Sequence, residues 1–428
     1  MPLACPPTLR RAPRAAARHV RPLLMALALC AAPLAQAAPA WITVGERAYA
    51  LLQQQAPAPR SQGSTQAALA GGASETVHLV QVDEEQLEAL SQAVHESLRR
   101  CGGYRWHASR AEGLQALQAL RTAPALPAVA APSYAIDNAD LVQPLLAQVQ
   151  DSRILATIQT LSDFQNRYYT SNPGVQASDQ LAALWTSLAA GRGNVSVRQV
   201  SHRGWPQKSV VLTLQGSSQA KQKVVLGAHL DSIVSGKVTD STRAPGADDD
   251  ASGVASLTEV IRVLLGSGYQ PRRTIEFMAY AAEEVGLRGS QAIAQQYKRQ
   301  RQQVVGVLQL DMTAFQGSAG DLYLFTDYTN AAQNTFLANL AAAYLPELTV
   351  GYDRCGYGCS DHASWTAAGF AASFPFEAAF ADDNKAIHTA NDTTATFGNQ
   401  ALHAAKFSRL ALAYAVELGT DGPTLNGR

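Results

Sequence analysis

The stretch from Val224 to Gly253 decides how this chain of 428 residues is organised. It begins with VVLGAHLDS and, after a loop, ends with PGADDDASG. Its apolar start is typical of a buried parallel strand, and this run stops at His229 and Asp231. Ligands of open α/β sheets gather at the carboxyl ends of the strands. A histidine followed by acids at such an edge therefore predicts a metal site.

Two later stretches repeat this pattern. RTIEFMAYAAEE runs from Arg273 to Glu284 and ends on two adjacent glutamates, and VVGVLQLDM runs from Val304 to Met312 and carries Asp311 near its end. Packing alone does not explain three apolar strands that each end in a carboxylate or an imidazole. We interpret the chain as a metallohydrolase whose ligands come from neighbouring strands.

Helical and strand-like segments alternate from Ser133 to the end of the chain. The apolar periodicity predicts helices at 140–161, 177–190, 251–265, 286–301, 330–345 and 399–418. It predicts further strands at 195–201, 209–216, 223–229, 322–326 and 370–375. This alternation favours an α/β fold with a mostly parallel, mixed central sheet covered by helices on both faces. Residues 133–428 are expected to form the catalytic domain.

Residues 1–37 have the features of a signal peptide. Five arginines precede the apolar run Leu23–Leu34, and Ala35-Gln36-Ala37 fits a small-residue cleavage site. The apolar run is short for a membrane span, so we expect cleavage and a secreted, extracellular or periplasmic protein without stable membrane association. A retained anchor is the alternative.

Charge argues against a nucleic-acid partner. Without residues 1–37 the chain keeps 29 basic and 34 acidic residues, and it contains no basic tract. Proteins that bind nucleic acids usually show a basic patch or stripe.

The segment 38–132 differs from the rest of the chain in its sequence pattern. It contains a strand-like run at Val77–Asp83, an amphipathic helix at Glu84–Arg100 and an Ala/Pro-rich stretch at Thr122–Pro132 that is typical of an exposed linker. We expect a small α+β pro-segment that is removed from a zymogen. A permanently attached N-terminal domain is the alternative.

Zinc accepts imidazole nitrogen and carboxylate oxygen, and a pair of zinc ions needs about five protein ligands. The chain offers His229, one of Asp248–Asp250, Glu283 or Glu284, Asp311, and a late histidine, for which His388 in IHTANDT is the best candidate with Asp392 as support. Each also has an ordinary interpretation. Acids before a helix are often N-caps, and paired glutamates are often solvated.

Six motifs in this order resemble those of metallopeptidase family 28: HLDS, PGADDDASG, AYAAEEVGLRGS, LQLDM, CGYGCSDHASW and IHTANDT. The resemblance extends over about Ser133–Gly419, includes NRYYT at Asn166–Thr170, and is strongest to the secreted bacterial leucyl aminopeptidases with two zinc ions. It implies a zinc-exopeptidase fold and two Zn²⁺ per chain.

The resemblance also implies a role for each site residue. His229 and Asp311 would bind one zinc, Glu284 and His388 the other, and Asp249 would bridge both. Glu283 would be the general base that takes a proton from the zinc-bound water. Asp231 would orient His229, and Tyr357 would stabilise the developing oxyanion.

Cys355 and Cys359 in CGYGC are close enough for a small disulfide loop in an oxidising compartment. A zinc-binding pair is the alternative, but the chain has no second cysteine pair to complete such a site.

Apolar residues flank the ligands and predict a pocket for the substrate side chain, with ordinary core packing as the alternative: Met312, Phe374, Phe376, Phe380 and Ile387. The resemblance implies cleavage after leucine and other large apolar N-terminal residues. We expect a monomer whose partners are peptides with a free N-terminus. The rival interpretations are a related carboxypeptidase-like enzyme, a glutaminyl cyclase, and a non-catalytic binding module on a peptidase fold.

Overall fold

The computed structural model describes residues 40–55, 57–68, 74–98, 103–121, 134–355 and 357–420. The expected signal peptide and the Ala/Pro-rich stretch lie outside these residues. Within them, no helix is both long and apolar enough to cross a bilayer.

The N-terminal segment contains a four-stranded antiparallel sheet in the order β2-β3-β1-β4. Its elements are β1 (Ala40–Gly45), α1 (Glu46–Leu52), β2 (Ser61–Ala68), β3 (Ser74–Val82), α2 (Glu84–Leu98), β4 (Tyr104–His107) and α3 (Arg110–Arg121). The predicted strand and helix correspond to β3 and α2. Helix α2 begins there because Asp83 and Gln86 form a reciprocal capping box, in which each side chain accepts the backbone N–H of the other.

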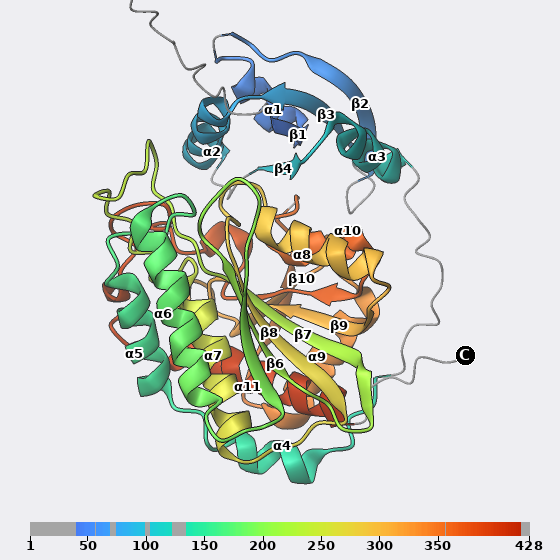
Figure 1. Cartoon of the computed structure of the whole chain (residues 1–428), viewed down its shortest axis with the longest axis vertical. Helices are drawn as coiled ribbons and strands as arrows, with labels where there is room; N and C mark the ends of the chain where they lie inside the picture. The colour runs from blue at the N-terminus through green and yellow to red at the C-terminus, as the bar shows by residue number, and fades with distance from the viewer. Residues whose placement is uncertain are drawn as a thin grey trace, which may run out of the picture. The chain divides into compact units, whose positions relative to one another are not determined.

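A six-stranded mixed sheet, in the order β12-β9-β7-β8-β6-β5, forms the centre of the larger segment (Figure 1). Strands β12, β9, β7 and β8 are parallel to one another, whereas β6 pairs antiparallel with β8 and β5 pairs antiparallel with β6. The bounds are β5 (Val195–Val200), β6 (Ser209–Leu214), β7 (Gln219–His229), β8 (Arg273–Tyr280), β9 (Gln303–Gln309) and β12 (Ala372–Ser373). The predicted fold class is confirmed.

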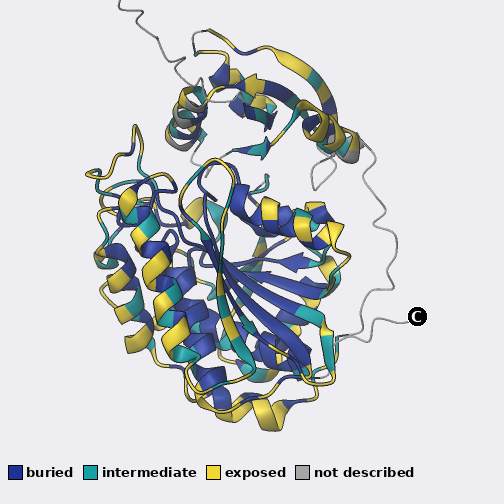
Figure 2. Ribbon diagram, viewed as in Figure 1, coloured by how far each residue is buried: buried dark blue, intermediate teal, exposed yellow. Residues whose placement is uncertain are grey.

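Helices cover both faces of this sheet. The cluster on one face joins the sheet to α4 (Ala139–Leu146), α5 (Asp151–Ser162), α6 (Asn172–Leu188), α7 (Ala251–Gly266), α9 (Ala331–Tyr344) and α11 (Leu402–Thr420). The other face packs against α8 (Arg288–Arg299) and α10 (His362–Ala368). Because both faces are covered, the inner strands are mostly buried, as Figure 2 shows, and β8 is buried throughout, whereas the edge strand β5 is not.

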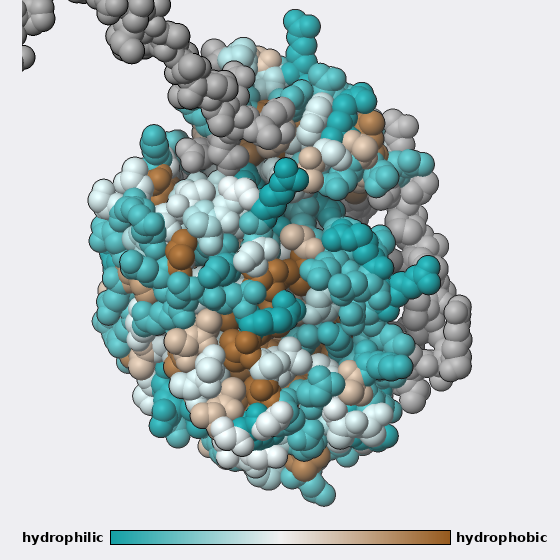
Figure 3. Space-filling model, viewed as in Figure 1, coloured by the Kyte–Doolittle hydropathy of each residue, from teal (hydrophilic) through white to brown (hydrophobic). Residues whose placement is uncertain are grey.

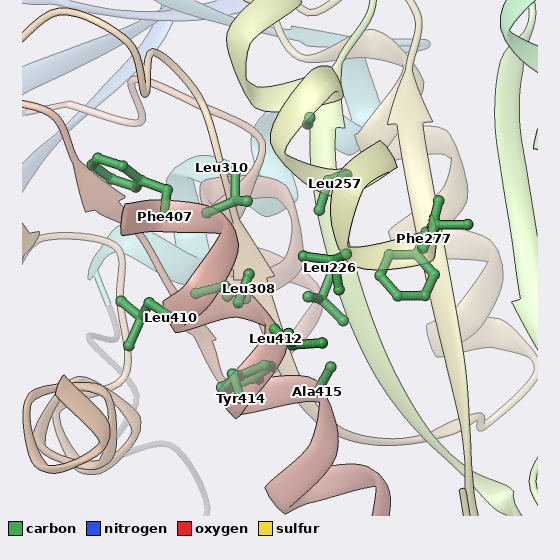
Figure 4. Packing of buried hydrophobic residues seen from close by; sticks show 14 of the residues in the cluster. Leu226, Leu257, Phe277, Leu308, Leu310, Phe407, Leu410, Leu412, Tyr414 and Ala415 are labelled. Carbon is green, nitrogen blue, oxygen red and sulfur yellow. The ribbon is translucent and has the colours of Figure 1, made fainter. Parts of the chain in front are cut away.

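Part of the core lies where α7 and α11 meet the sheet. In Figure 4, Leu412 and Ala415 of α11 point toward Leu226 of β7, and Leu257 of α7 lies over the same strand. These side chains are fully buried, and each buried leucine contributes roughly 1.5–3 kcal/mol relative to an exposed one. The face drawn in Figure 3 is mostly hydrophilic, with hydrophobic residues in a band near its centre and in smaller scattered spots.

A second sheet of three strands, in the order β11-β10-β13, lies in the C-terminal half. It consists of β10 (Leu322–Phe325), β11 (Val350–Asp353) and β13 (Pro375–Phe376). The predicted strand at 370–375 is therefore divided between two sheets, with β12 in the central one. Two short 3₁₀ helices, η2 (Phe380–Asp382) and η3 (Thr394–Phe397), flank the loop that carries His388.

The single helix predicted at 140–161 is wrong, because the chain forms α4 and α5 with a turn between them. The backbone N–H of Gln150, before α5, donates to Glu259 Oε1 of α7 at 2.7 Å. This tertiary hydrogen bond fixes the start of α5 independently of the apolar periodicity. The other predicted helices and strands are present, with shifts of a few residues at their ends.

Candidate metal centre

The three ligand-bearing strands lie side by side, and their carboxyl ends meet at one edge. His229 is the last residue of β7 and lies opposite Tyr280, the last residue of β8. Gly227 lies opposite Gln309, the last residue of β9. Glu283, Glu284 and Asp311 follow these ends directly, so the parallel pairing brings them to His229.

Asp249 lies between two imidazoles. Its Oδ1 is 2.9 Å from His229 Nε2, and its Oδ2 is 3.0 Å from His388 Nε2. The two nitrogens therefore face opposite oxygens of one buried carboxylate. This arrangement fits a carboxylate that bridges two metal ions with one imidazole on each.

Glu284 and Asp311 complete the set, one beside each imidazole. Glu284 Oε2 is 2.8 Å from His388 Nε2, and Asp311 Oδ1 is 3.5 Å from His229 Nε2. The buried oxygens Glu284 Oε1 and Asp311 Oδ1 accept no hydrogen bond from the described residues. Two imidazoles, three carboxylates and unused oxygens are the donor set that zinc prefers, so the site fits the expected metal.

The sequence left open which of the three consecutive acids binds metal. Both Asp249 and Asp250 occur in groups that fit a cation, the first with His229 and Glu284 and the second with His229 and Asp311. Asp250, however, already accepts three backbone N–H groups, from His229, Gly253 and Met312. Asp249 faces the two imidazoles, and we therefore assign it as the ligand.

Asp231 does not orient His229 through its carboxylate as directly as expected. Its carboxylate oxygen is 3.7 Å from His229 Nδ1, whereas its backbone oxygen is 3.1 Å away. The carboxylate instead accepts the backbone N–H groups of Glu283 and Glu284 at 2.9 and 3.2 Å. Asp231 thus fixes the paired glutamates after β8 to the end of β7.

Asp392 supports the site through the backbone of the acidic motif, since its carboxylate accepts the backbone N–H groups of Asp248 and Asp249 at 3.1 Å each. Asn384 donates from its amide to Asp248 and Asp392, and Ser360 donates to Asp311 at 2.6 Å. The sequence analysis missed Asn384 and Ser360 as supporting residues. Their only signal was position, since Ser360 lies within CGYGCSDHASW and Asn384 lies three residues before IHTANDT.

Burial dominates the electrostatics of the site. It raises the pKa of Glu283 well above its usual range and that of Glu284 to about 7. Burial also opposes ionisation of Asp249, but hydrogen bonds from His229 and His388 outweigh it and lower the pKa of Asp249. A divalent cation bound among these groups would offset the cost of keeping the other carboxylates charged.

Three non-glycine residues around the site have left-handed backbone angles: Ala282 at φ 58°, Met312 at φ 56° and His388 at φ 55°. Such conformations cost about 1–3 kcal/mol each, and they cluster at functional sites. His388 is itself a predicted ligand, and Ala282 and Met312 directly adjoin Glu283 and Asp311.

The Cys355–Cys359 disulfide is confirmed, with an S–S distance of 2.00 Å. Tyr357, the expected oxyanion donor, lies within this short loop. Its half-buried ring packs edge-on against Phe380, with 6.3 Å between the ring centroids.

The five predicted pocket residues lie in one apolar cluster with the disulfide. Phe325, which the sequence analysis missed, lies at its centre, 4.8 Å from Phe376 and 5.3 Å from Phe374 between ring centroids. Met312 and Ile387 connect the cluster to the ligands Asp311 and His388 by direct chain continuity. Most members are buried, and Tyr323, Tyr357 and Phe380 are the partly exposed ones.

Comparison with known proteins places this geometry in a family. Residues 209–413 match the profile of peptidase family M28. A probable leucine aminopeptidase of Arthroderma otae is 37% identical over 258 residues, which cover 59% of this chain and 69% of the relative. Leucine aminopeptidase 1 of Pyrenophora tritici-repentis is 36% identical over 299 residues, 67% of this chain and 75% of the relative.

A solved structure agrees with these relatives. The LapA aminopeptidase of Legionella pneumophila superposes with a TM-score of 0.77 at 29% identity, over 90% of this chain and 99% of that one. With the strand-end ligand cluster and relatives above 30% identity matched over more than two thirds of their length, the chain belongs to peptidase family M28.

Proposed function

We propose that this metalloaminopeptidase uses two zinc ions to remove N-terminal residues from peptides, with a preference for leucine and other large apolar residues. The observation that carries the proposal is Asp249 between His229 Nε2 and His388 Nε2, at 2.9 and 3.0 Å. When bound, two zinc ions would supply an acidified water molecule and polarise the scissile carbonyl.

The protein residues divide the remaining work. His229 and Asp311 would hold one ion, Glu284 and His388 the other, and Asp249 both. The carboxylate of Asp231 accepts the backbone N–H groups of the paired glutamates and so holds Glu283 beside the ligands. The carboxylate of Glu283 would not bind metal.

Glu283 would take the proton from the attacking water and pass it to the leaving amine. Its side chain is almost fully buried, and burial raises its affinity for a proton. A group that exchanges a proton within a water-excluding site suits this task. Tyr357 would donate a hydrogen bond to the oxyanion, from the loop closed by the disulfide.

The apolar cluster next to the ligands supports the preference for large apolar residues. It contains phenylalanine rings and Met312, which directly follows the ligand Asp311. We further propose that residues 1–37 direct secretion. The secreted chain would then be a zymogen, from which the pro-segment 38–132 is removed.

Hydrolysis of Leu-p-nitroanilide tests the function. We expect turnover that disappears with a chelator and returns with Zn²⁺, two equivalents of zinc by metal analysis, and little activity on the matched N-acetyl substrate. Equal cleavage of the blocked substrate, or cyclisation of an N-terminal glutamine peptide as the main reaction, would contradict it.

A further inference from the structure

Arg167 is a fully buried arginine that lies close to the metal centre but was not assigned a function. Its guanidinium donates to four backbone carbonyl oxygens, those of Leu161, Leu230, Pro245 and Gly246. The distances to Leu230 and Gly246 are 2.8 and 2.9 Å. A planar guanidinium with five N–H groups is the only side chain that satisfies such a set at once.

Two of these carbonyl groups belong to separate ligand-bearing segments. Leu230 lies between His229 and Asp231 at the end of β7, and Gly246 precedes Asp249 by three residues. The loop between these segments leaves the sheet at one point and returns at the other. Arg167 joins the two ends at the base of that loop.

Neighbouring contacts strengthen this connection. The backbone N–H of Arg167 donates to Ser232 Oγ at 3.0 Å, and Ser232 Oγ donates to the Ala244 carbonyl at 2.8 Å. The Asn166 amide donates to the carbonyls of Thr239 and Thr242, in the same loop. Asn166 and Arg167 are therefore hydrogen-bonded both to the middle of the loop between Leu230 and Gly246 and to its two ends.

Gly246 shows how closely the Arg167 guanidinium packs against the segment that carries Asp249. It has φ +51°, and a Cβ atom there would lie 2.8 Å from Arg167 Nη2 and 2.3 Å from the Asp249 carbonyl oxygen. No side chain can be added at this point without displacing the guanidinium or the ligand segment.

The positive charge of Arg167 is balanced at a distance. Burial lowers its pKa, while Asp250, Asp392, Asp249 and Asp231 favour the charged form. The guanidinium hydrogen bonds go to carbonyl groups, so these acids keep their oxygens for backbone N–H groups and for metal.

We propose that Arg167 is a positioning residue that sets the distance between His229 and Asp249, and so the zinc affinity of the site, through the fork of its guanidinium. The inference rests on the proposed zinc function. The role depends on the shape of the guanidinium and not on its charge, since a lysine would keep the charge but could not form the four hydrogen bonds to the carbonyl groups.

Arg273 provides a matched control. It is also fully buried, and it donates to the Leu418 carbonyl at 2.9 Å and to Gln222. It begins β8, whereas the metal centre lies beyond the other end of that strand. Its replacement should reduce stability without touching the ligands.

The test measures the zinc dissociation constant of the full chain by competition with a chelator, and urea unfolding of the zinc-free protein. We expect Arg167→Lys and Arg167→Met each to weaken zinc binding by roughly 10–100-fold, as other supporting residues of metal sites do. Arg273→Met should leave zinc binding within about twofold at a similar loss of stability. Excess zinc should restore much of the lost kcat in Arg167→Lys.

Wild-type zinc affinity in Arg167→Lys or Arg167→Met overturns the proposal, as does an equal zinc loss in Arg273→Met. Ser232→Ala, a milder change to the same connection, decides the question if neither Arg167 variant folds: it should weaken zinc binding severalfold, and unchanged affinity overturns the proposal. A wild-type chain that binds no zinc would instead refute the proposed function, so the two failures are distinguishable.

Discussion

The backbone of Glu283 is held at the metal centre, because Asp231 accepts its N–H group. The buried side chain of Glu283 is the one for which we propose proton exchange. We predict that Glu283→Gln binds two zinc ions with near-normal affinity and loses roughly 10²–10⁴ in kcat, the usual contribution of a general base. Metal analysis and steady-state rates on Leu-p-nitroanilide measure both quantities.

Glu276 offers the matched control for that change. It is equally buried on β8, but its carboxylate pairs with Lys223 at 2.9 Å and accepts from Tyr297 at 2.7 Å. Glu276→Gln should lower stability and keep kcat within a few-fold. A Glu283→Gln enzyme with near-normal turnover would show that another group serves as the base.

The residues Asp248–Asp250 show where sequence reasoning ends. All three are buried acids in one motif, yet Asp249 faces the imidazoles, Asp250 holds three N–H groups, and Asp248 accepts from Ala314 and Asn384. Their roles depend on residues that are distant in sequence. Residue types and spacing predicted that an acid binds here, and only the resemblance to a family singled out Asp249.

At the scale of elements, Asp250 joins three of them. It caps α7 by accepting from Gly253, and it also accepts from His229 at the end of β7 and from Met312 after β9. An N-cap alone contributes about 0.5–2 kcal/mol. Asp250→Ala also leaves two more buried N–H groups unpaired, at about 1–3 kcal/mol each. We therefore predict a loss of about 3 kcal/mol or more in the unfolding free energy of the zinc-free protein.

Asn330 is the control for a simple cap, because its side chain accepts from Gln333 at the start of α9 and lies in another part of the fold. Asn330→Ala should cost only about 1 kcal/mol. Equal losses in the two variants, measured by urea unfolding, would mean that Asp250 acts as a helix cap and nothing more.

The parallel strands and long helices were predictable because each carries its own apolar pattern. The N-terminal sheet was predictable only in part, since β2 reads SQGSTQAA and contains no apolar run. It is paired along β3, so its partner and not its composition makes it a strand. The turn between α4 and α5 was missed for the same reason, because it depends on Glu259 of a distant helix.

At the scale of the whole molecule, buried neutral histidines make stability depend on pH. Burial, with Lys406 nearby, lowers the pKa of His403 to about 4, against about 6.5 for an unperturbed histidine. Between about pH 6.5 and pH 4, His403 is therefore protonated in the unfolded chain but neutral in the folded chain. This contribution to stability is complete above pH 6.5 and is lost as the pH falls toward 4.

We predict that His403→Gln removes this loss while keeping a donor for the Glu377 carbonyl, which His403 Nε2 contacts at 3.1 Å. Between pH 7 and pH 5 the zinc-free wild type should lose about 2 kcal/mol more than the variant. The raised pKa values of Glu283 and Glu284 act in the opposite sense, so only the difference between the two proteins isolates His403. Parallel curves of unfolding free energy against pH would refute the assignment.

The N-terminal segment has a core of its own, built from residues of β1, α1, β3, α2 and β4. Removing it should therefore leave the central sheet and the metal centre intact. It also contacts the chain just after the paired glutamates: Arg105 Nε donates to Gln291 Oε1 at 3.4 Å, and the Arg288 guanidinium lies 5.7 Å from the Trp106 ring. We infer that its presence restricts the entry of peptides.

We predict that separating residues 38–132 from the rest raises kcat/KM, more for peptides than for the small Leu-p-nitroanilide. A specific protease site inserted within 122–132 of the full chain allows the same preparation to be measured before and after cleavage. The uncut protein is the control, and zinc content should not change. A cut protein that keeps its zinc and its fold but has lower activity on both substrates would show that the segment is a working part of the enzyme.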